Sequence, residues 1–151
     1  MIRVQAEDFD IGAEIAALTE GRHAIGGVAS FVGLVREIAP AGSGAASSMT
    51  LEHYPGMTEK RLAEIEAEAQ RRWPLAASLI IHRYGRLEPG DRIVLVATAS
   101  SHREAALESC AFLIDWLKTE APFWKLEDGP EGARWVEAKS SDDARQAAWK
   151  K

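Results

Sequence analysis

The chain has 151 residues, of which 46% are hydrophobic and 27% charged, and this size and composition fit one domain that can bury its own core. A single cysteine excludes a disulfide framework within the chain, and no apolar run approaches the roughly 20 residues of a membrane span, so we expect a cytoplasmic protein in a reducing compartment. The formal net charge of −5 argues against general nucleic-acid binding, which needs a broad basic surface, so any anion site must be local.

The first third of the chain predicts a strand, a helix and a glycine-rich strand. Apolar residues alternate over residues 2–6, and helical spacing follows behind Asp8 or Asp10 as the cap. Residues 25–38, IGGVASFVGLVREI, carry three glycines among β-forming residues, which indicates a bulge or the close approach of another backbone. Residues 39–48, APAGSGAASS, predict a mobile loop rather than a domain linker, because the strand-like MTLEHY follows at once.

The middle of the chain predicts a helix followed by an antiparallel hairpin. A Pro-Gly turn opens a helix over about residues 58–73, and the next proline ends it. Two β runs, ASLIIHRY (77–84) and RIVLVATAS (92–100), are joined by GRLEPGD, whose Pro-Gly-Asp sequence is a turn signal. The two runs should therefore pair with each other.

The last third predicts a long helix, a second hairpin and a short helix. The S-x-x-E spacing of SHRE indicates a capping box that opens a helix over about residues 102–120. After Pro122, the segments FWKLE and RWVEAK flank the turn DGPEG, and a short helix begins at about Ser141. Strands and helices mix without regular β-α-β alternation. We therefore predict an α+β fold, a single domain over residues 1–151 with largely antiparallel sheets and helices packed alongside.

Two lysines bracket a proline and two aromatics in LKTEAPFWKLE, residues 117–127. Pro122 must end the helix, so Lys118 should lie in its last turn, where a cation suits the helix dipole, and Lys125 should lie on the extended segment that follows. One interpretation is a helix-terminal lysine, an aromatic anchor and an exposed lysine. The other is a pair of amines that converge on one site, and the local sequence leaves both open.

Three further basic residues are candidates for anion binding. His102 and Arg103 fall in the first turn of the long helix, where the dipole disfavours cations. Either Glu104 compensates, or an anion is held by the helix N–H groups, the imidazole and the guanidinium together. Arg36 ends the strand FVGLVR, where its fork either reaches a phosphate or carboxylate at a pocket mouth or is solvated.

The remaining reactive side chains predict neither a metal site nor a cysteine nucleophile. His53 alternates with Leu51 and is read as a hydrogen-bonded core histidine, since no other histidine, cysteine or acid stands near it at metal-ligand spacing. Cys110 lies on the apolar stripe of the long helix, which favours an inert packed thiol over a nucleophile paired with His102. We predict no metal and no cofactor.

Several of these motifs together resemble the large, catalytic subunit of molybdopterin synthase. The similarity runs in order from about residue 25 to 140 and is carried by FVGLVR (31–36), LEHYPGMTEK (51–60), SHRE (101–104), LKTEAPFWK (117–125) and EGARWVEAK (131–139). The resemblance implies an α/β-hammerhead-like fold. It also implies an enzyme of molybdenum cofactor biosynthesis that installs two sulfurs on cyclic pyranopterin monophosphate as a dithiolene.

The resemblance also implies partners. In the family, sulfur arrives as a thiocarboxylate on the C-terminal Gly-Gly tail of a small ubiquitin-like subunit, which threads into a pocket of the large one. Two large subunits form a central homodimer, and a small subunit binds at each end to complete a heterotetramer. The single cysteine fits this arrangement, because one thiol cannot supply two sulfurs.

Site residues follow from the resemblance position by position. Lys118 and Lys125 are the expected catalytic residues: Lys118 would contact the thiocarboxylate and help expel the tail's carboxylate, and Lys125 would move protons on the pterin side, or the reverse. The expected substrate-binding and pocket residues are Arg36, His102, Arg103, Lys139, Phe31 and Ile114. In the family, the residues that match His102 and Arg103 reach the site from the neighbouring large subunit.

Two other classes of function fit the same residues. A non-catalytic module could capture an extended peptide tail beside a sheet edge, with the basic residues holding only its C-terminal carboxylate. A scaffold protein would leave the lysines solvated. Both predict that the chain makes no product from a pterin precursor and a thiocarboxylated partner.

Overall fold

The computed structural model describes residues 1–37, 48–129, 132–136 and 140–149. Within these residues the strands form two four-stranded sheets. Sheet A has the order β1-β4-β6-β2 and consists of β1 (Ile2–Gln5), β4 (Leu75–Arg83), β6 (Arg92–Ser100) and β2 (Gly27–Leu34). Sheet B has the order β5-β3-β7-β8 and consists of β5 (Gly85–Leu87), β3 (Ser48–His53), β7 (Phe123–Gly129) and β8 (Gly132–Val136).

The predicted α+β class and largely antiparallel pairing are confirmed. Only β1 and β4 run parallel among the described strand pairs, and every other pair is antiparallel. The predicted loop over 39–48 lies outside the described residues except for Ser48, which begins β3.

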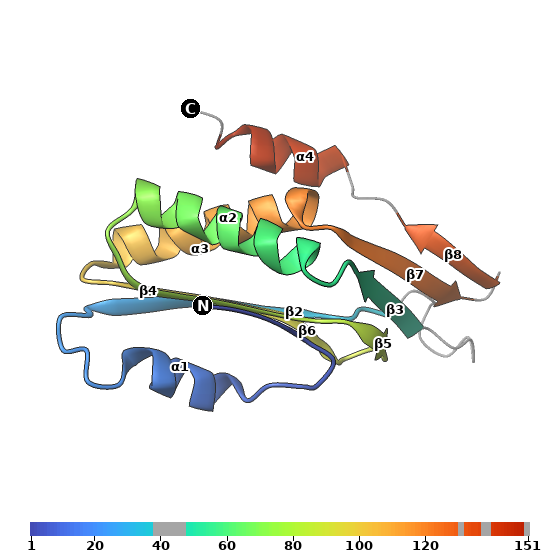
Figure 1. The fold of residues 1–151 in the computed structure, drawn as a ribbon, viewed down its shortest axis with the longest axis horizontal. Helices are drawn as coiled ribbons and strands as arrows, with labels where there is room; N and C mark the ends of the chain where they lie inside the picture. The colour runs from blue at the N-terminus through green and yellow to red at the C-terminus, as the bar shows by residue number, and fades with distance from the viewer. Residues whose placement is uncertain (38–47, 130–131, 137–139, 150–151) are drawn as a thin grey trace.

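Helices cover both faces of sheet A (Figure 1). The helices are α1 (Ile11–Thr19), α2 (Met57–Arg72), α3 (Arg103–Glu120) and α4 (Ser140–Ala147). Figure 1 shows α2 and α3 on one face, α1 on the other, and α4 outside α3. None of the helices in the described ranges is both long and apolar enough to cross a bilayer.

Two clusters of buried apolar side chains fill the layers. The larger one joins sheet A to α2 and α3 through residues such as Ile80, Val96, Leu62 and Phe112, and it continues into sheet B through Leu51. The smaller one lies on the α1 face of sheet A and consists of Phe9, Leu79, Ile81, Leu95 and Ala97. Neighbouring residues of β4 point to opposite faces of the sheet, as strand geometry requires, so Ile80 and Ile81 enter different clusters.

The sequence predicted a bulge or a close backbone approach for the glycines at and just before β2, and the structure has both. A Cβ on Gly26 would lie 2.0 Å from the carbonyl oxygen of Ser101, so only glycine allows this close approach of the backbone before α3. The pairing of β2 with β6 shifts register between Gly33 and Leu34, which is the predicted bulge.

Both predicted hairpin pairings are confirmed, but the first contains an extra strand. β4 pairs antiparallel with β6, and β7 pairs with β8. The segment between β4 and β6 leaves sheet A to form β5, which pairs with β3 in sheet B. This short strand connects the two sheets next to the end of β4.

The predicted capping box at SHRE is wrong. α3 begins at Arg103 with His102 as its N-cap, and no side chain makes a cap hydrogen bond. Because the helix begins one residue later than a Ser101 cap requires, Ala105 occupies the third helical position that Glu104 would need.

Candidate active site

Lys118 and Lys125 lie on two different elements, as predicted. α3 ends at Glu120, and β7 begins at Phe123, directly after Pro122. Lys118 is exposed in the last turn of α3, and Lys125 is partly buried as the third residue of β7. The proline that breaks the helix therefore separates the two amines by one sharp change of chain direction.

A buried hydroxyl holds this change of direction in place. Thr58, in the first turn of α2, is completely buried, and its Oγ1 donates a 3.0 Å hydrogen bond to the carbonyl oxygen of Pro122. Oγ1 of Thr58 also accepts a 3.0 Å hydrogen bond from the backbone N–H of Tyr54. The start of α2 is thereby tied to the connection between the two lysines.

The side chain of His82 is buried, and the charges of both lysines act on it. Burial lowers the pKa of His82 to about 3, and the positive charges of Lys118 and Lys125 act in the same direction, against a hydrogen bond to the Arg83 carbonyl that raises it. Both ammonium groups therefore lie close enough to the same buried ring to influence it. The ring also stacks on Phe123, with centroids 3.7 Å apart and an interplanar angle of 18°.

Arg36 lies at the same end of sheet A as the lysines. His82 of β4 and Gly33 of β2 both pair with Val94 of β6, so these residues form one row across the sheet. Arg36 follows Gly33 by three residues and is exposed just beyond that row. Its guanidinium can therefore reach a ligand at this end of the sheet, and its binding of a phosphate stays a prediction.

Phe31 and Ile114 are both partly accessible apolar groups. Phe31 is 40% exposed on β2, the edge strand of sheet A, and Ile114 is a half-buried residue of α3 that packs against the larger core cluster. Partial exposure suits a pocket wall, but their place in a pocket stays a prediction.

His102 and Arg103 lie at the opposite end of the molecule from the lysines. A Cβ on Gly27 would lie 3.7 Å from the Cα of Arg103, and Gly27 pairs with Ser100 at the far end of β2 and β6. Lys118 follows Arg103 by fifteen residues in one helix, which corresponds to about 22 Å. A single chain therefore does not bring these basic groups to the lysines. Lys139 lies outside the described residues.

His53 is partly buried at the end of β3, whereas a core histidine was predicted, and a stacked ring and an acid lie beside it. Its ring stacks on Tyr84 with centroids 4.3 Å apart, and its Nε2 lies 3.7 Å from Oε1 of Glu59. Across the described ranges, no group of three or more histidines, cysteines or acids is placed to hold a metal ion.

Cys110 is packed in the core rather than displayed for chemistry. It is buried on α3, its Sγ lies 4.0 Å from the carbonyl oxygen of Val96, and burial raises the pKa of its thiol to about 11. The thiol stays protonated at neutral pH, which supports the interpretation of an inert packed cysteine.

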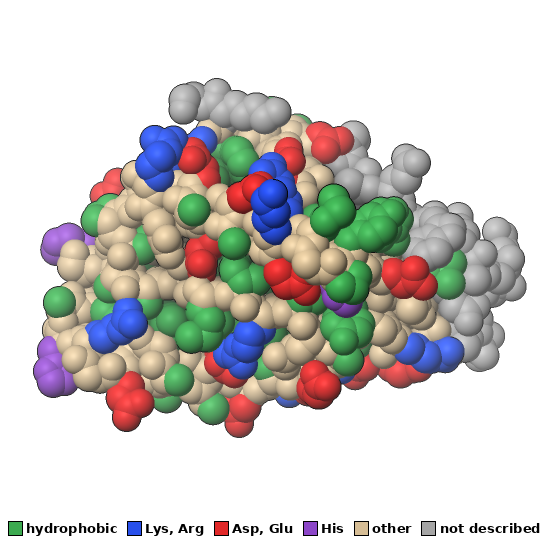
Figure 2. Space-filling model, in the orientation of Figure 1, with side chains coloured by type: hydrophobic (Ala, Val, Ile, Leu, Met, Phe, Trp, Pro, Cys, Tyr) green, Lys and Arg blue, Asp and Glu red, His purple; other side chains and the backbone are tan. Residues whose placement is uncertain are grey.

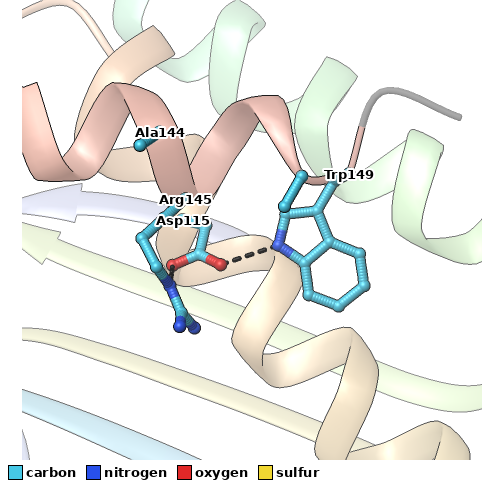
Figure 3. A pocket seen from close by; sticks show the side chains of 5 residues that line it. Asp115, Ala144, Arg145 and Trp149 are labelled. Atoms are coloured by element: carbon cyan, nitrogen blue, oxygen red, sulfur yellow. Dashed lines mark hydrogen bonds and ion pairs between the residues drawn. The ribbon is translucent and has the colours of Figure 1, made fainter.

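A hollow of about 410 Å³ lies between α3 and α4 (Figure 3). It is lined by Asp115, Ala144, Arg145, Ala148 and Trp149. The Nε1 of Trp149 donates a 2.7 Å hydrogen bond to one oxygen of Asp115, and Nε of Arg145 lies 3.4 Å from the other. These groups hold α4 against α3, so the hollow is a gap in a helix contact and we do not assign the chemistry to it.

The surface charge agrees with a local anion site. Figure 2 shows one face of the molecule, where lysines and arginines alternate with acidic side chains among the described residues. The described residues of this face therefore offer nucleic acid no continuous basic track.

His82 is the site residue that the sequence did not reveal. This histidine has no readable signal in the sequence, but the structure buries it and stacks it on Phe123, and the charges of both lysines lower its pKa. Its position in the strand could have indicated that it is buried. His82 lies two residues after Ile80 and so points, like Ile80, into the larger core. A polar ring at an apolar core position requires an explanation.

Comparisons with known proteins point to one family. The family described as MoaE protein matches residues 4–120. The molybdopterin synthase catalytic subunit of Ralstonia nicotianae is 59% identical over 98% of this chain and 83% of its own length. The protein of the same name from Escherichia coli is 50% identical over 98% of this chain and 97% of its own length.

Solved structures agree with the sequence relatives. The molybdopterin biosynthesis MoaE protein from Burkholderia ambifaria superposes with a TM-score of 0.84 at 55% identity, over 99% of this chain and 97% of that one. The molybdopterin synthase structure from Staphylococcus aureus gives a TM-score of 0.79 at 31% identity, over 89% and 96% of the two chains.

Proposed function

The chain belongs to the MoaE protein family, which makes it a sulfurtransferase of molybdenum cofactor biosynthesis, and we propose that Lys118 and Lys125 carry out its chemistry. The sulfur donor is the C-terminal thiocarboxylate of a small ubiquitin-like partner subunit. The acceptor is cyclic pyranopterin monophosphate, and the product is the dithiolene of molybdopterin. The observation that supports the assignment of the two lysines is their placement on the last turn of α3 and on β7, on either side of Phe123, whose ring stacks on the buried His82.

Two positive amines at one site suit a reaction in which both partners are anionic. Lys118, on the exposed last turn of α3, receives the thiocarboxylate of the tail and stabilises the carboxylate that leaves after sulfur transfer. Lys125, partly buried on β7, orients the pterin and moves protons on it. The opposite assignment of the two roles fits the same geometry.

The sulfur must come from outside the chain. Cys110 is its only cysteine, and burial raises the pKa of that thiol to about 11. A buried protonated thiol is a poor nucleophile, and one sulfur atom cannot supply two. This supports a carrier protein as the donor and the cytoplasm, where thiols stay reduced, as the place of reaction.

A second copy of the chain completes the site. The phosphate of the pterin needs cations, and Arg36, which follows the row of sheet A that contains His82, is a candidate to bind it. His102 and Arg103 lie about 22 Å away along α3, so they reach the phosphate only from a neighbouring chain. Lys139, Phe31 and Ile114 complete the proposed phosphate and pocket contacts.

Reconstitution tests this function. The purified chain is mixed with the pterin precursor and a thiocarboxylated small subunit, and the dithiolene product is measured. The matched control is the same small subunit with an ordinary carboxylate terminus, which binds but carries no sulfur. We expect product only with the thiocarboxylate. Tight binding of both forms without product would instead identify a module that only captures the tail.

A further inference from the structure

His82 occupies a position where a polar side chain is costly. It is 5% exposed in β4, directly after Ile80 and Ile81, which are completely buried. Its Nδ1 lies 2.9 Å from the carbonyl oxygen of Arg83. A carbonyl only accepts, so Nδ1 carries a hydrogen. Because burial lowers the pKa of the ring to about 3, Nε2 keeps its lone pair and the ring is neutral at pH 7.

The ring of His82 lies against the chain segment that connects the two lysines. It stacks on Phe123, which is the first residue of β7 and follows Lys118 by five residues. Phe123 and Lys125 are two residues apart on one strand, so their side chains share a face. A contact that holds the ring of Phe123 in place therefore also helps to hold the side chain of Lys125 in its direction on β7.

The charges around this ring explain why an uncharged group is needed. Lys118 of α3, Lys125 of β7 and His53 of β3 all face it, Arg83 is its neighbour in β4, and Glu59 of α2 lies beside His53. A cation at position 82 would add a repelling charge between the two amines. A neutral planar ring fills the same space without that repulsion.

We propose that His82 is a positioning residue for Lys118 and Lys125, because its neutral ring stacks on Phe123 and fixes the point where the chain passes from one amine to the other. This role rests on the sulfur transfer proposed above. It requires the ring and does not require a proton on Nε2.

Two variants separate the ring from its polar atom. His82→Phe keeps a ring that can stack on Phe123, and His82→Asn keeps a short hydrogen-bond donor but no ring. Both remove the titratable group. We expect His82→Phe to retain most of kcat, whereas His82→Asn loses about 10- to 100-fold in kcat, the scale expected when a catalytic group is misplaced by about 1 Å. The KM for the partner subunit should change much less than kcat, because the tail is still captured.

A change on the other side of the stack should have the same effect. Phe123→Leu removes that ring and should lower kcat about as much as His82→Asn. The double variant should lose little more than the worse single one, since both changes break one contact. Additive losses from the two changes would overturn the proposal.

A core control and a pH profile complete the test. Ile80→Ala removes packing two residues earlier on the same strand face, and it should lower the melting temperature without a comparable loss of kcat.

Between pH 5.5 and 9 the pH profile of kcat for His82→Phe should keep the shape of the wild-type profile. The proposal is overturned if His82→Asn has wild-type kcat or if His82→Phe has a kcat no higher than that of His82→Asn. It is also overturned if Ile80→Ala loses as much kcat as His82→Asn, or if an acidic limb of the wild-type pH profile disappears in His82→Phe. An inactive wild-type chain would contradict the sulfur transfer itself rather than the role of His82.

Discussion

The hydroxyl of Thr58 donates a 3.0 Å hydrogen bond to the carbonyl oxygen of Pro122, and this contact ties the first turn of α2 to the chain between the two lysines. The two residues are 64 positions apart in sequence. The bond shows that the angle between α3 and β7 is set from outside the segment that contains the amines.

Removing this hydroxyl should weaken both the fold and the catalysis. Thr58→Val keeps the shape of the side chain but leaves the N–H of Tyr54 and the carbonyl of Pro122 without their buried partner. We expect the free energy of unfolding to fall by about 1–3 kcal/mol, together with a lower kcat. Denaturant unfolding and steady-state turnover measure the two effects. Thr58→Ser keeps the hydroxyl and should stay near wild type in both; equal behaviour of the valine and serine variants would rule out this role of the bond.

Two copies of the chain should share each site. Lys118→Ala and Arg103→Ala homodimers are each defective at both sites, but a mixed dimer has one intact site. Random mixing of equal amounts should therefore restore about a quarter of the wild-type activity. The matched control mixes Lys118→Ala with Lys125→Ala: because both lysines belong to one chain's site, no mixed dimer has an intact site. Equal recovery in the two mixtures, or none in either, would contradict a shared site.

The stability of the protein should depend on pH through His82. The pKa of this side chain is lowered from 6.5 to about 3 on folding, so between these values the unfolded chain binds a proton that the folded chain does not. Its contribution to stability is complete above pH 6.5 and is lost as the pH falls towards 3, with a slope of up to about 1.4 kcal/mol per pH unit. As the pH falls from 6.5 towards 3, the free energy of unfolding of wild type should therefore fall relative to that of His82→Phe, which lacks the titrating group. Parallel curves from pH 7 to 4 would show that His82 is not a buried neutral histidine.

Cys110 should be dispensable for sulfur transfer. Its thiol is buried, with a pKa raised to about 11, so a thiol reagent at pH 7.5 should label it only after denaturation. Cys110→Ala should keep wild-type kcat with the thiocarboxylated partner, with a small loss of stability from the lost packing. A large loss of kcat without unfolding would show that the chain's own sulfur takes part.

The separation of the two lysines could be predicted from sequence because local rules govern it. Pro122 cannot continue a helix, so Lys118 and Lys125 had to lie on different elements. The bulge and the close backbone approach at the glycines of β2 followed from local steric rules in the same way.

Long-range geometry was not available from those rules. The short strand β5 has a turn-rich sequence and becomes a strand only because β3 offers it a pairing edge in sheet B. His82 looked like any histidine in a β run, because its partners Phe123 and Lys118 come from elements far along the chain. The distance from Arg103 to Lys118 follows from the length of α3, but only the sheet shows that Arg36 and Arg103 lie at opposite ends of one molecule.

The central claim is that two amines of one chain converge on a single sulfur-transfer site, and single-turnover measurement with the lysine variants tests it most directly. Lys118→Ala and Lys125→Ala are each mixed in excess with the thiocarboxylated partner and the pterin precursor, and the dithiolene formed is followed over time. We expect each variant to keep its fold and its binding of the partner while product formation slows by about 100-fold or more, the scale of a lost proton-transfer or charge-stabilising group. Near-normal product formation by both variants would contradict the account.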